Sequence, residues 1–243
     1  GESFLFESVE GGEHLGRYSF VGCNPRGIIR QTGDRVEFME GGKLVQDYQV
    51  RPQPVPGTHE VRDGLEVVEA VLRKYRAVTL PDLPRFTGGA VGFIGYEFIH
   101  DVEPVVPRPP TDDLRTPTMY FLIADELLVF DRINQTLTIL VNAVVDEFDT
   151  PEEAYENATA ELERLVSLLE QPAESRAVKV PLEAPPVTLT SNVPREKFLA
   201  NVLKAKQYIR SGDIIQVVGS QRFSTKFEAS PLDLYRAARS INP

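Results

Sequence analysis

The sequence contains one cysteine, no tryptophan and three histidines among its 243 residues. A single cysteine, Cys23, excludes a disulfide within the chain, which suits the reducing cytoplasm that we expect as its location. A structural zinc ion takes four cysteine or histidine ligands, so the one cysteine and all three histidines would have to meet at a single ion. We therefore do not expect a zinc cluster. We interpret the thiol of Cys23 as a packing group and not as a nucleophile.

Long apolar runs and clusters of basic residues are also missing. No stretch approaches the roughly 20 apolar residues that span a bilayer, and the first residues lack the pattern of a signal peptide. A net charge of -10 argues against a nucleic-acid surface, which usually carries a basic patch. We therefore expect neither a membrane nor a nucleic acid as partner, although a local field could still attract a small anion.

The residues that are present suit a folded domain with a substantial core. Hydrophobic residues make up 42% and charged residues 26%, close to the average for globular proteins. The length is enough for one large domain or for one and a half ordinary ones. The sequence begins with Gly1 and not with methionine, so we expect that its natural start is missing.

The first half of the chain is predicted to be mostly β-structure followed by a helix. Apolar or loosely alternating runs predict strands over 3–8, 18–22, 27–31, 35–39 and 44–50. The turn signal Glu40-Gly41-Gly42-Lys43 joins the last two of these strands into a hairpin. Apolar residues at helical spacing then predict an amphipathic helix over 61–76.

The second half alternates strands, helices and proline-rich segments. We expect strands over 86–96, 119–130, 136–145 and 213–223, helices over 151–169, 193–211 and 231–240, an extended loop over 102–117 and a linker over 171–187. Thr150 is predicted to cap the second helix of the chain and Asn192 or Ser191 the third, which Gly212 is predicted to end. On the strand 213–223, Gln216, Ser220 and Arg222 share one face, which could line a polar cavity or bond between sheets.

Three residues near the start are candidates for binding a small molecule. Glu7 and Ser8 lie where a strand gives way to a turn, so they could hold the ammonium group of an amino acid or form an ordinary solvated turn. Arg17 could bind a ligand carboxylate through two hydrogen bonds, or it could make a structural salt bridge.

No convincing catalytic constellation stands out in the sequence. The glycine-rich segment 88–96 lacks the Gly-Lys-Ser/Thr ending of a phosphate-binding loop, and its small residues indicate close packing by a neighbouring element. His14, His59 and His100 lie in turn-like or loop-edge contexts, which favours surface or packing roles.

Several segments in order resemble one enzyme family. The segments 4–20, 88–96 and 198–223, the last with Gly212-Asp213-Ile214-Ile215-Gln216-Val217-Val218, are similar to anthranilate synthase component I, the large chorismate-binding subunit. The final stretch, 239–243, resembles the sequence that follows in that family. The resemblance covers essentially the whole chain.

The resemblance implies an α+β fold, a sandwich of antiparallel sheets flanked by helices that is incomplete in this chain. It implies an N-terminal regulatory domain over 1–170, a linker over 171–192 and the beginning of the chorismate-binding domain over 193–243. It also implies a parent lyase of tryptophan biosynthesis that converts chorismate and ammonia to anthranilate and pyruvate. Ammonia would come from glutamine through an amidotransferase subunit, component II, and Mg²⁺ would hold chorismate.

The same resemblance implies feedback inhibition by L-tryptophan. The family's motif for this site falls on Phe6, Glu7 and Ser8, and we add Arg17 as a candidate from its own chemistry. The residues expected to contact chorismate or metal would follow position 243, so we expect no catalytic and no metal-binding residue in this chain and no activity from it alone.

Other readings remain open from the sequence. The nearest is aminodeoxychorismate synthase component I, a related enzyme of folate synthesis. A different class is a non-catalytic, amino-acid-binding regulatory module, and a third is a docking scaffold for the amidotransferase.

Overall fold

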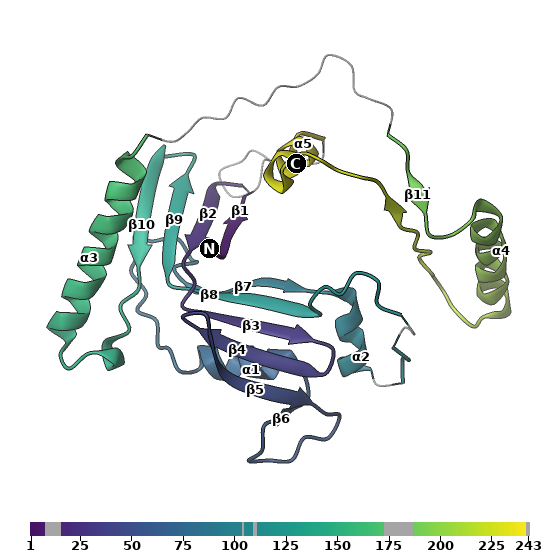
Figure 1. Cartoon of the computed structure of the whole chain (residues 1–243), viewed down its shortest axis with the longest axis horizontal. Helices are drawn as coiled ribbons and strands as arrows, with labels where there is room; N and C mark the ends of the chain where they lie inside the picture. The colour runs from purple at the N-terminus through teal and green to yellow at the C-terminus, as the bar shows by residue number, and fades with distance from the viewer. Residues whose placement is uncertain (8–15, 104, 109–110, 173–186, 242–243) are drawn as a thin grey trace. The chain divides into compact units, whose positions relative to one another are not determined.

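In a computed structural model the chain forms two compact units, Gly1–Ala173 and Glu174–Pro243 (Figure 1). The structure describes residues 1–7, 16–103, 105–108, 111–172 and 187–241. The division between the units lies within the segment that the sequence predicts as a linker. The roles assigned to the two parts, and their boundaries at 170 and 193, stay predictions.

A six-stranded sheet forms one part of the first unit, in the order β6-β5-β4-β3-β8-β7. Its strands are β3 (Gly27–Thr32), β4 (Arg35–Glu40), β5 (Lys43–Val50), β6 (Glu60–Val61), β7 (Gly89–Ile94) and β8 (Met119–Ala124). Neighbours pair antiparallel except β5 and β6, which are parallel. The predicted hairpin of β4 and β5 is confirmed, with Glu40 paired to Lys43 across the turn.

A four-stranded antiparallel sheet forms the other part of this unit, in the order β1-β2-β9-β10. Its strands are β1 (Ser3–Phe6), β2 (Tyr18–Cys23), β9 (Glu126–Asp131) and β10 (Thr136–Val141). The central pair, β2 and β9, brings Tyr18 opposite Asp131. This pairing of distant segments positions the candidate site described below.

The two sheets are joined where the chain passes from β2 to β3 and from β8 to β9. Arg26, in the first crossing, donates through Nε to Asp125 Oδ2 in the second at 2.8 Å, and through Nη1 to Glu147 Oε1 at 2.6 Å. Burial raises the pKa of Asp125 even though the neighbouring guanidinium favours its charged form. The prediction of one strand over 119–130 is therefore wrong, because the chain changes sheets at Asp125.

The main core lies between the six-stranded sheet and α1 (Gly64–Leu72). The helix is shorter than predicted because Asp63 caps it, accepting from the backbone N–H of Leu65 at 2.9 Å, while Glu60–Val61 join the sheet. The helix contributes three valines to a cluster that excludes water: Val67, Val68 and Val71 pack with Ile29, Val36, Phe38, Met119 and Ile123. Val68 and Val71 of the apolar stripe predicted from the sequence thus face the sheet, whereas Leu65 of the same stripe is 36% exposed.

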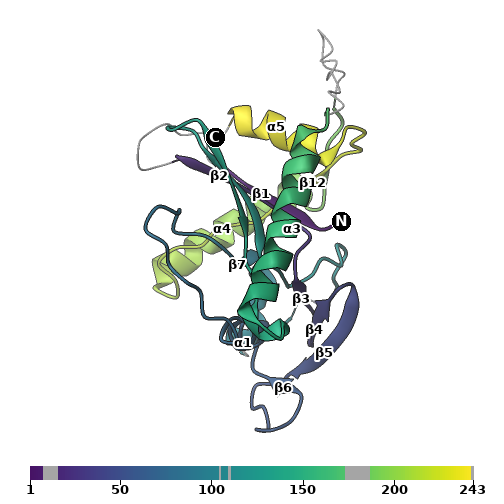
Figure 2. The same ribbon diagram turned by 90° about the vertical axis from the view of Figure 1, so that its left-hand side faces the viewer.

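The four-stranded sheet is accompanied by α3 (Pro151–Glu170), which runs along β10 (Figure 1) and faces the viewer in Figure 2. Thr150 caps this helix as predicted, its Oγ1 accepting from the N–H of Glu153 at 3.2 Å. Ala154 and Leu165 are its buried residues. Three short helices of the described residues, η1 (Tyr96–Phe98), α2 (Ile99–Val102) and η2 (Val145–Glu147), also belong to this unit.

The second unit contains a short ladder of β11 (Thr190–Ser191) and β12 (Phe223–Ser224) and two helices, α4 (Arg195–Ser211) and α5 (Pro231–Ile241). Gly212 ends α4 with a φ of 84°, as predicted. The predicted side-chain cap is wrong. Asn192 Oδ1 instead accepts from the N–H of Arg222, and Ser191 Oγ accepts from Gln221 Nε2.

The predicted strand over 213–223 is also wrong, since only its last residue enters β12. Gln216 and Ser220 are exposed there, and Ile215 is 97% exposed. A strand needs ladder hydrogen bonds from a neighbour, and the described residues pair only Phe223–Ser224 with β11. The expected fold class, α+β with antiparallel sheets and helices, is confirmed.

The glycine-rich strand β7 packs tightly on its neighbour β8. A Cβ atom built on Gly92 would lie 1.9 Å from the carbonyl oxygen of Tyr120 and 2.7 Å from the Cα atom of Phe121. Both obstacles are backbone atoms, which cannot rotate away. The close packing expected from the glycines is therefore a property of this strand, and it requires glycine at this position.

We predict that Gly92→Ala lowers the free energy of unfolding by about 1–3 kcal/mol, the usual cost of overpacking. Urea unfolding followed by circular dichroism would measure it. Gly219→Ala is the matched control, since its Cβ atom would meet only Phe198 Cε2 at an ordinary 3.8 Å. Equal stability of the two variants would contradict the close approach.

Candidate functional site

The candidate site lies at the end of the four-stranded sheet where Arg17 meets Asp131. Arg17 Nη2 donates to Asp131 Oδ2 at 2.6 Å, and Nε lies 3.1 Å from both carboxylate oxygens. The β2–β9 register brings these residues together, although 114 positions separate them. The arginine side chain is 33% exposed and its guanidinium carbon lies 4.8 Å from the ring centroid of Tyr18.

Asp131 is the fixed anchor of this pair. Besides Arg17, its Oδ1 accepts from the backbone N–H groups of Ile133 and Asn134, and its Oδ2 accepts from Asn134 Nδ2. The Arg17 guanidinium, followed by these backbone N–H groups, lowers the pKa of the Asp131 carboxyl group to about 2. The carboxylate therefore stays charged across the physiological range and holds the guanidinium in one orientation.

Glu7 follows β1 and meets the residue after Asp131. Arg132 Nη2 lies 3.6 Å from Glu7 Oε2 and donates to Ser19 Oγ at 2.9 Å. The Glu7 side chain is only 10% exposed. The register of β1 and β2 pairs Phe6 with Phe20, and one further step sets Glu7 beside Ser19. Ser8, the remaining candidate, lies outside the described residues.

The sheet thus gathers a carboxylate and a guanidinium at the ends of adjacent strands. Arg17 uses two of its N–H groups on Asp131. Its guanidinium group has other N–H groups, so it can still donate to a ligand carboxylate. The sequence did not point to Asp131, Arg132 or Ser19. The dipeptide Asp131-Arg132 lies at a predicted strand end, but only the pairing register shows what it faces.

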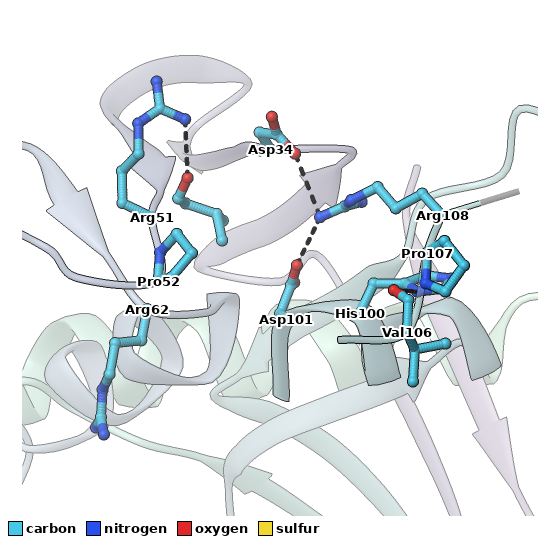
Figure 3. Close-up of a pocket in the computed structure, with 10 residues that line it drawn as sticks. Asp34, Arg51, Pro52, Arg62, His100, Asp101, Val106, Pro107 and Arg108 are labelled. Atoms are coloured by element: carbon cyan, nitrogen blue, oxygen red, sulfur yellow. Dashed lines mark hydrogen bonds and ion pairs between the residues drawn. The ribbon is translucent and has the colours of Figure 1, made fainter. Parts of the chain in front are cut away.

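A second candidate is an open pocket of about 300 Å³ beside α2 (Figure 3). Its lining includes three arginines, one histidine and two aspartates: Arg51, Arg62, Arg108, His100, Asp34 and Asp101. The basic groups are engaged within the protein. Arg108 Nη2 lies 2.7 Å from Asp101 Oδ1 and 3.2 Å from Asp34 Oδ1, and Arg62 pairs with Glu66.

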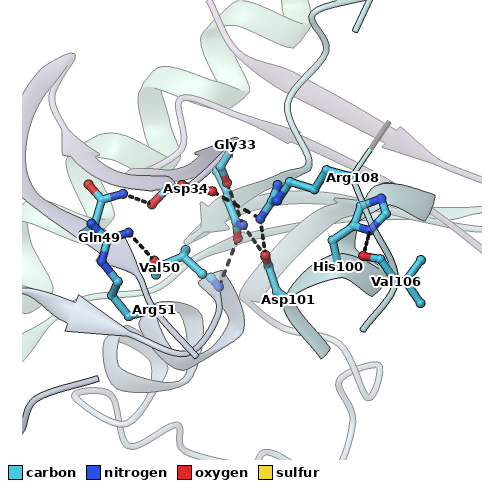
Figure 4. A network of polar contacts seen from close by, with 11 residues as sticks. Gly33, Asp34, Gln49, Val50, Arg51, His100, Asp101, Val106 and Arg108 are labelled. Atoms are coloured by element: carbon cyan, nitrogen blue, oxygen red, sulfur yellow. Dashed lines mark hydrogen bonds and ion pairs between the residues drawn. The ribbon is translucent and has the colours of Figure 1, made fainter. Parts of the chain in front are cut away.

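The polar contacts around this pocket continue into the core (Figure 4). The fully buried Gln31 donates through Nε2 to Asp101 Oδ2 at 2.5 Å, and its Oε1 accepts from the N–H of Gly64, the first residue of α1. Asp101 therefore links Arg108 to the sheet and the helix. This arrangement ties the segment after α2 to the domain, and we assign it a structural role.

The other sequence candidates have structural partners where they are described. His59 Nδ1 lies 3.2 Å from the carbonyl oxygen of Asp47 and His100 Nδ1 lies 3.1 Å from that of Val106, while His14 lies outside the described residues. Burial, and next to it the nearby Glu126 carboxylate, raise the pKa of the half-buried Cys23 thiol. The raised pKa disfavours the thiolate form that a nucleophile needs.

Neither a metal-binding cluster nor a membrane-spanning helix is found among the described residues. Nowhere in them do three or more His, Cys, Asp or Glu side chains converge in a way that could hold a metal ion. Among the helices of the same residues, none is long and apolar enough to cross a membrane.

We predict that Asp131→Asn destabilises the protein most near neutral pH. A lowered pKa in the folded state means that the ionised carboxylate stabilises the fold fully above the unfolded-state pKa of about 4. This stabilisation disappears as the pH falls through about 2. The difference in urea-unfolding free energy between the two proteins should therefore shrink from about pH 4 to about pH 2.

The matched control is Asp47→Asn, which removes an exposed carboxylate 3.3 Å from Arg35 and should change stability less. A difference between the Asp131 variant and the unaltered protein that stays constant over this pH range would contradict the anchoring role of Asp131.

Comparison with known proteins agrees with this architecture. The chain is 36% identical to anthranilate synthase component 1 of Acetivibrio thermocellus and 37% identical to that of Pseudomonas putida, each over 99% of its length. It matches 46% of each of those proteins, so the chain spans about half the length of the curated relatives it matches.

A solved structure shows the same fold. Anthranilate synthase component I from Streptococcus pneumoniae TIGR4 superposes with a TM-score of 0.72 over 97% of this chain and 48% of that one, at 27% identity. The resemblance to anthranilate synthase component I that the sequence indicates is thus confirmed. Residues 21–243 match the family described as chorismate binding enzyme, and the chain belongs to that family.

Proposed function

We propose that this chain acts as part of an anthranilate synthase component I in the cytoplasm. The complete enzyme would convert chorismate and ammonia to anthranilate and pyruvate for tryptophan biosynthesis. The observation that carries the proposal is the alignment of 99% of the chain with proteins of that name, supported by the shared fold. By the same proposal this chain alone does not turn over chorismate.

The proposal includes a partner and a metal ion. A glutamine amidotransferase subunit, the component II that the name component I implies, would supply ammonia. Mg²⁺ would assist in holding chorismate in the complete enzyme. The described residues offer no cluster that fits this ion, so we assign no metal-dependent step to them.

The proposed contribution of this chain is half of a feedback site for L-tryptophan at Glu7, Ser8 and Arg17. The charges support this assignment. The Glu7 carboxylate is complementary to an α-ammonium group, and the N–H groups that Arg17 has beyond its two on Asp131 are complementary to a carboxylate. Glu7 directly follows β1 and Arg17 directly precedes β2, so a paired strand holds the backbone next to each residue.

The proposed reaction is tested on the full-length protein that contains this chain. With chorismate, ammonium and Mg²⁺, we expect the fluorescence of anthranilate to appear, with pyruvate in equal amount. Aminodeoxychorismate as product would instead identify the related enzyme of folate synthesis. Absence of any chorismate turnover would contradict the proposal, and a non-catalytic amino-acid-binding module or a docking scaffold would then be favoured.

The regulatory assignment is tested by Ser8→Ala in the same full-length protein. We expect the tryptophan concentration that halves activity to rise about threefold to tenfold, because one hydrogen bond to the ligand is lost. Ser167→Ala, on the exposed side of α3, is the matched control and should change nothing. Unchanged inhibition in the Ser8 variant would refute the assignment of this site.

A further inference from the structure

Arg132 has a position that the sequence did not suggest. It directly follows β9, and its backbone N–H donates to the carbonyl oxygen of Arg17 at 3.0 Å. Its guanidinium Nη2 donates to Ser19 Oγ at 2.9 Å and lies 3.6 Å from Glu7 Oε2. One residue therefore touches the backbone of one candidate ligand-binding residue and the carboxylate of another.

Glu7 requires such a neighbour for electrostatic reasons. A side chain that is 10% exposed has lost most of its water, and an ionised carboxylate in that setting is costly unless a cation or hydrogen-bond donors compensate it. Arg132 supplies the positive charge, and Ser19 holds the guanidinium in place at 2.9 Å. The Glu7 carboxylate thus has a cationic neighbour that follows a different strand, β9.

We propose that Arg132 is a positioning residue of the regulatory site, which orients the Glu7 carboxylate for the ammonium group of the amino-acid effector. This inference rests on the proposed function, since it presumes that an amino acid binds at Glu7. Arg132 acts through Glu7 and contacts no ligand itself. An oriented carboxylate loses less conformational entropy on binding, so the effector binds more tightly than to a free side chain.

The planar guanidinium is important for this role. Arg132 contacts Ser19 and Glu7 through the same Nη2 atom, which belongs to a rigid, planar group. Lysine offers a single, flexible ammonium group in its place. We therefore expect Arg132→Lys to keep the charge compensation and to lose part of the orientation.

The test is a double-mutant cycle in the full-length protein, with tryptophan inhibition of chorismate turnover as the readout. Arg132→Met should raise the half-inhibiting tryptophan concentration about threefold to tenfold, and Arg132→Lys by less. In a Glu7→Gln background, where no charged carboxylate remains to be oriented, Arg132→Met should add less than about a twofold change. Thermal unfolding of each variant separates this effect from loss of folding.

Arg30→Met is the matched control. Arg30 pairs with Glu37 at 2.6 Å with exposures of 41% and 17%, comparable to the Arg132–Glu7 pair, but on the six-stranded sheet. We expect it to leave turnover and inhibition unchanged. If Arg132→Met does not unfold the protein, it should shift the half-inhibiting tryptophan concentration less in the Glu7→Gln background than in the unaltered one. A shift of equal size in both backgrounds would overturn the proposal. If it does unfold the protein, Arg132→Lys decides, and inhibition identical to that of the unaltered protein overturns it.

The same measurements separate this inference from the function on which it rests. One outcome is that tryptophan inhibits the unaltered protein, with weaker inhibition in Ser8→Ala but unchanged inhibition in the Arg132 variants. That result refutes only the positioning role of Arg132. An unaltered protein that makes anthranilate without any response to tryptophan refutes the feedback site and, with it, the role of Arg132.

Discussion

The pairing of β2 with β9 is the constraint on which the candidate site depends. These antiparallel strands come from segments more than 100 positions apart, and their register sets Tyr18 against Asp131. Arg17, just before the first paired residue of β2, contacts the side chain of Asp131, the last paired residue of β9, and the backbone of Arg132 just beyond it. A shift of one residue would turn these side chains to the opposite face of the sheet and disperse the site.

The same two strands connect the site to the rest of the first unit. At its far end β2 leads to β3, and β9 begins directly after β8, so each strand is continuous with the six-stranded sheet. The ion pair of Arg26 with Asp125 joins the two crossings there. The site is therefore built on central strands of the four-stranded sheet that are continuous with the six-stranded sheet, which is the kind of support that keeps a binding group in place.

Much of the fold could be predicted from local sequence because the signals were local. The turn at Gly41-Gly42, the Thr150 cap and the Gly212 stop each depend on residues within a few positions, and each is confirmed. The failures involve distant partners. The run 119–130 reads as one apolar strand, yet Asp125 marks a change of sheet, and 213–222 has a strand pattern without a described neighbour.

The site was predictable only in part for the same reason. Glu7 and Arg17 could be chosen by residue type and by resemblance to a family. Their partners Asp131 and Arg132 could not, because the sequence gives strand ends but no register between strands. An isolated Asp-Arg pair at a turn is also common, so no local pattern sets it apart from a solvated loop.

A crystal structure of the full-length protein with L-tryptophan would test the central claim most directly. The account predicts the ligand's ammonium group within hydrogen-bonding distance of the Glu7 carboxylate, with Arg132 still beside that carboxylate and Arg17 still held by Asp131. Tryptophan bound elsewhere, with Glu7 making no contact to it, would contradict the account.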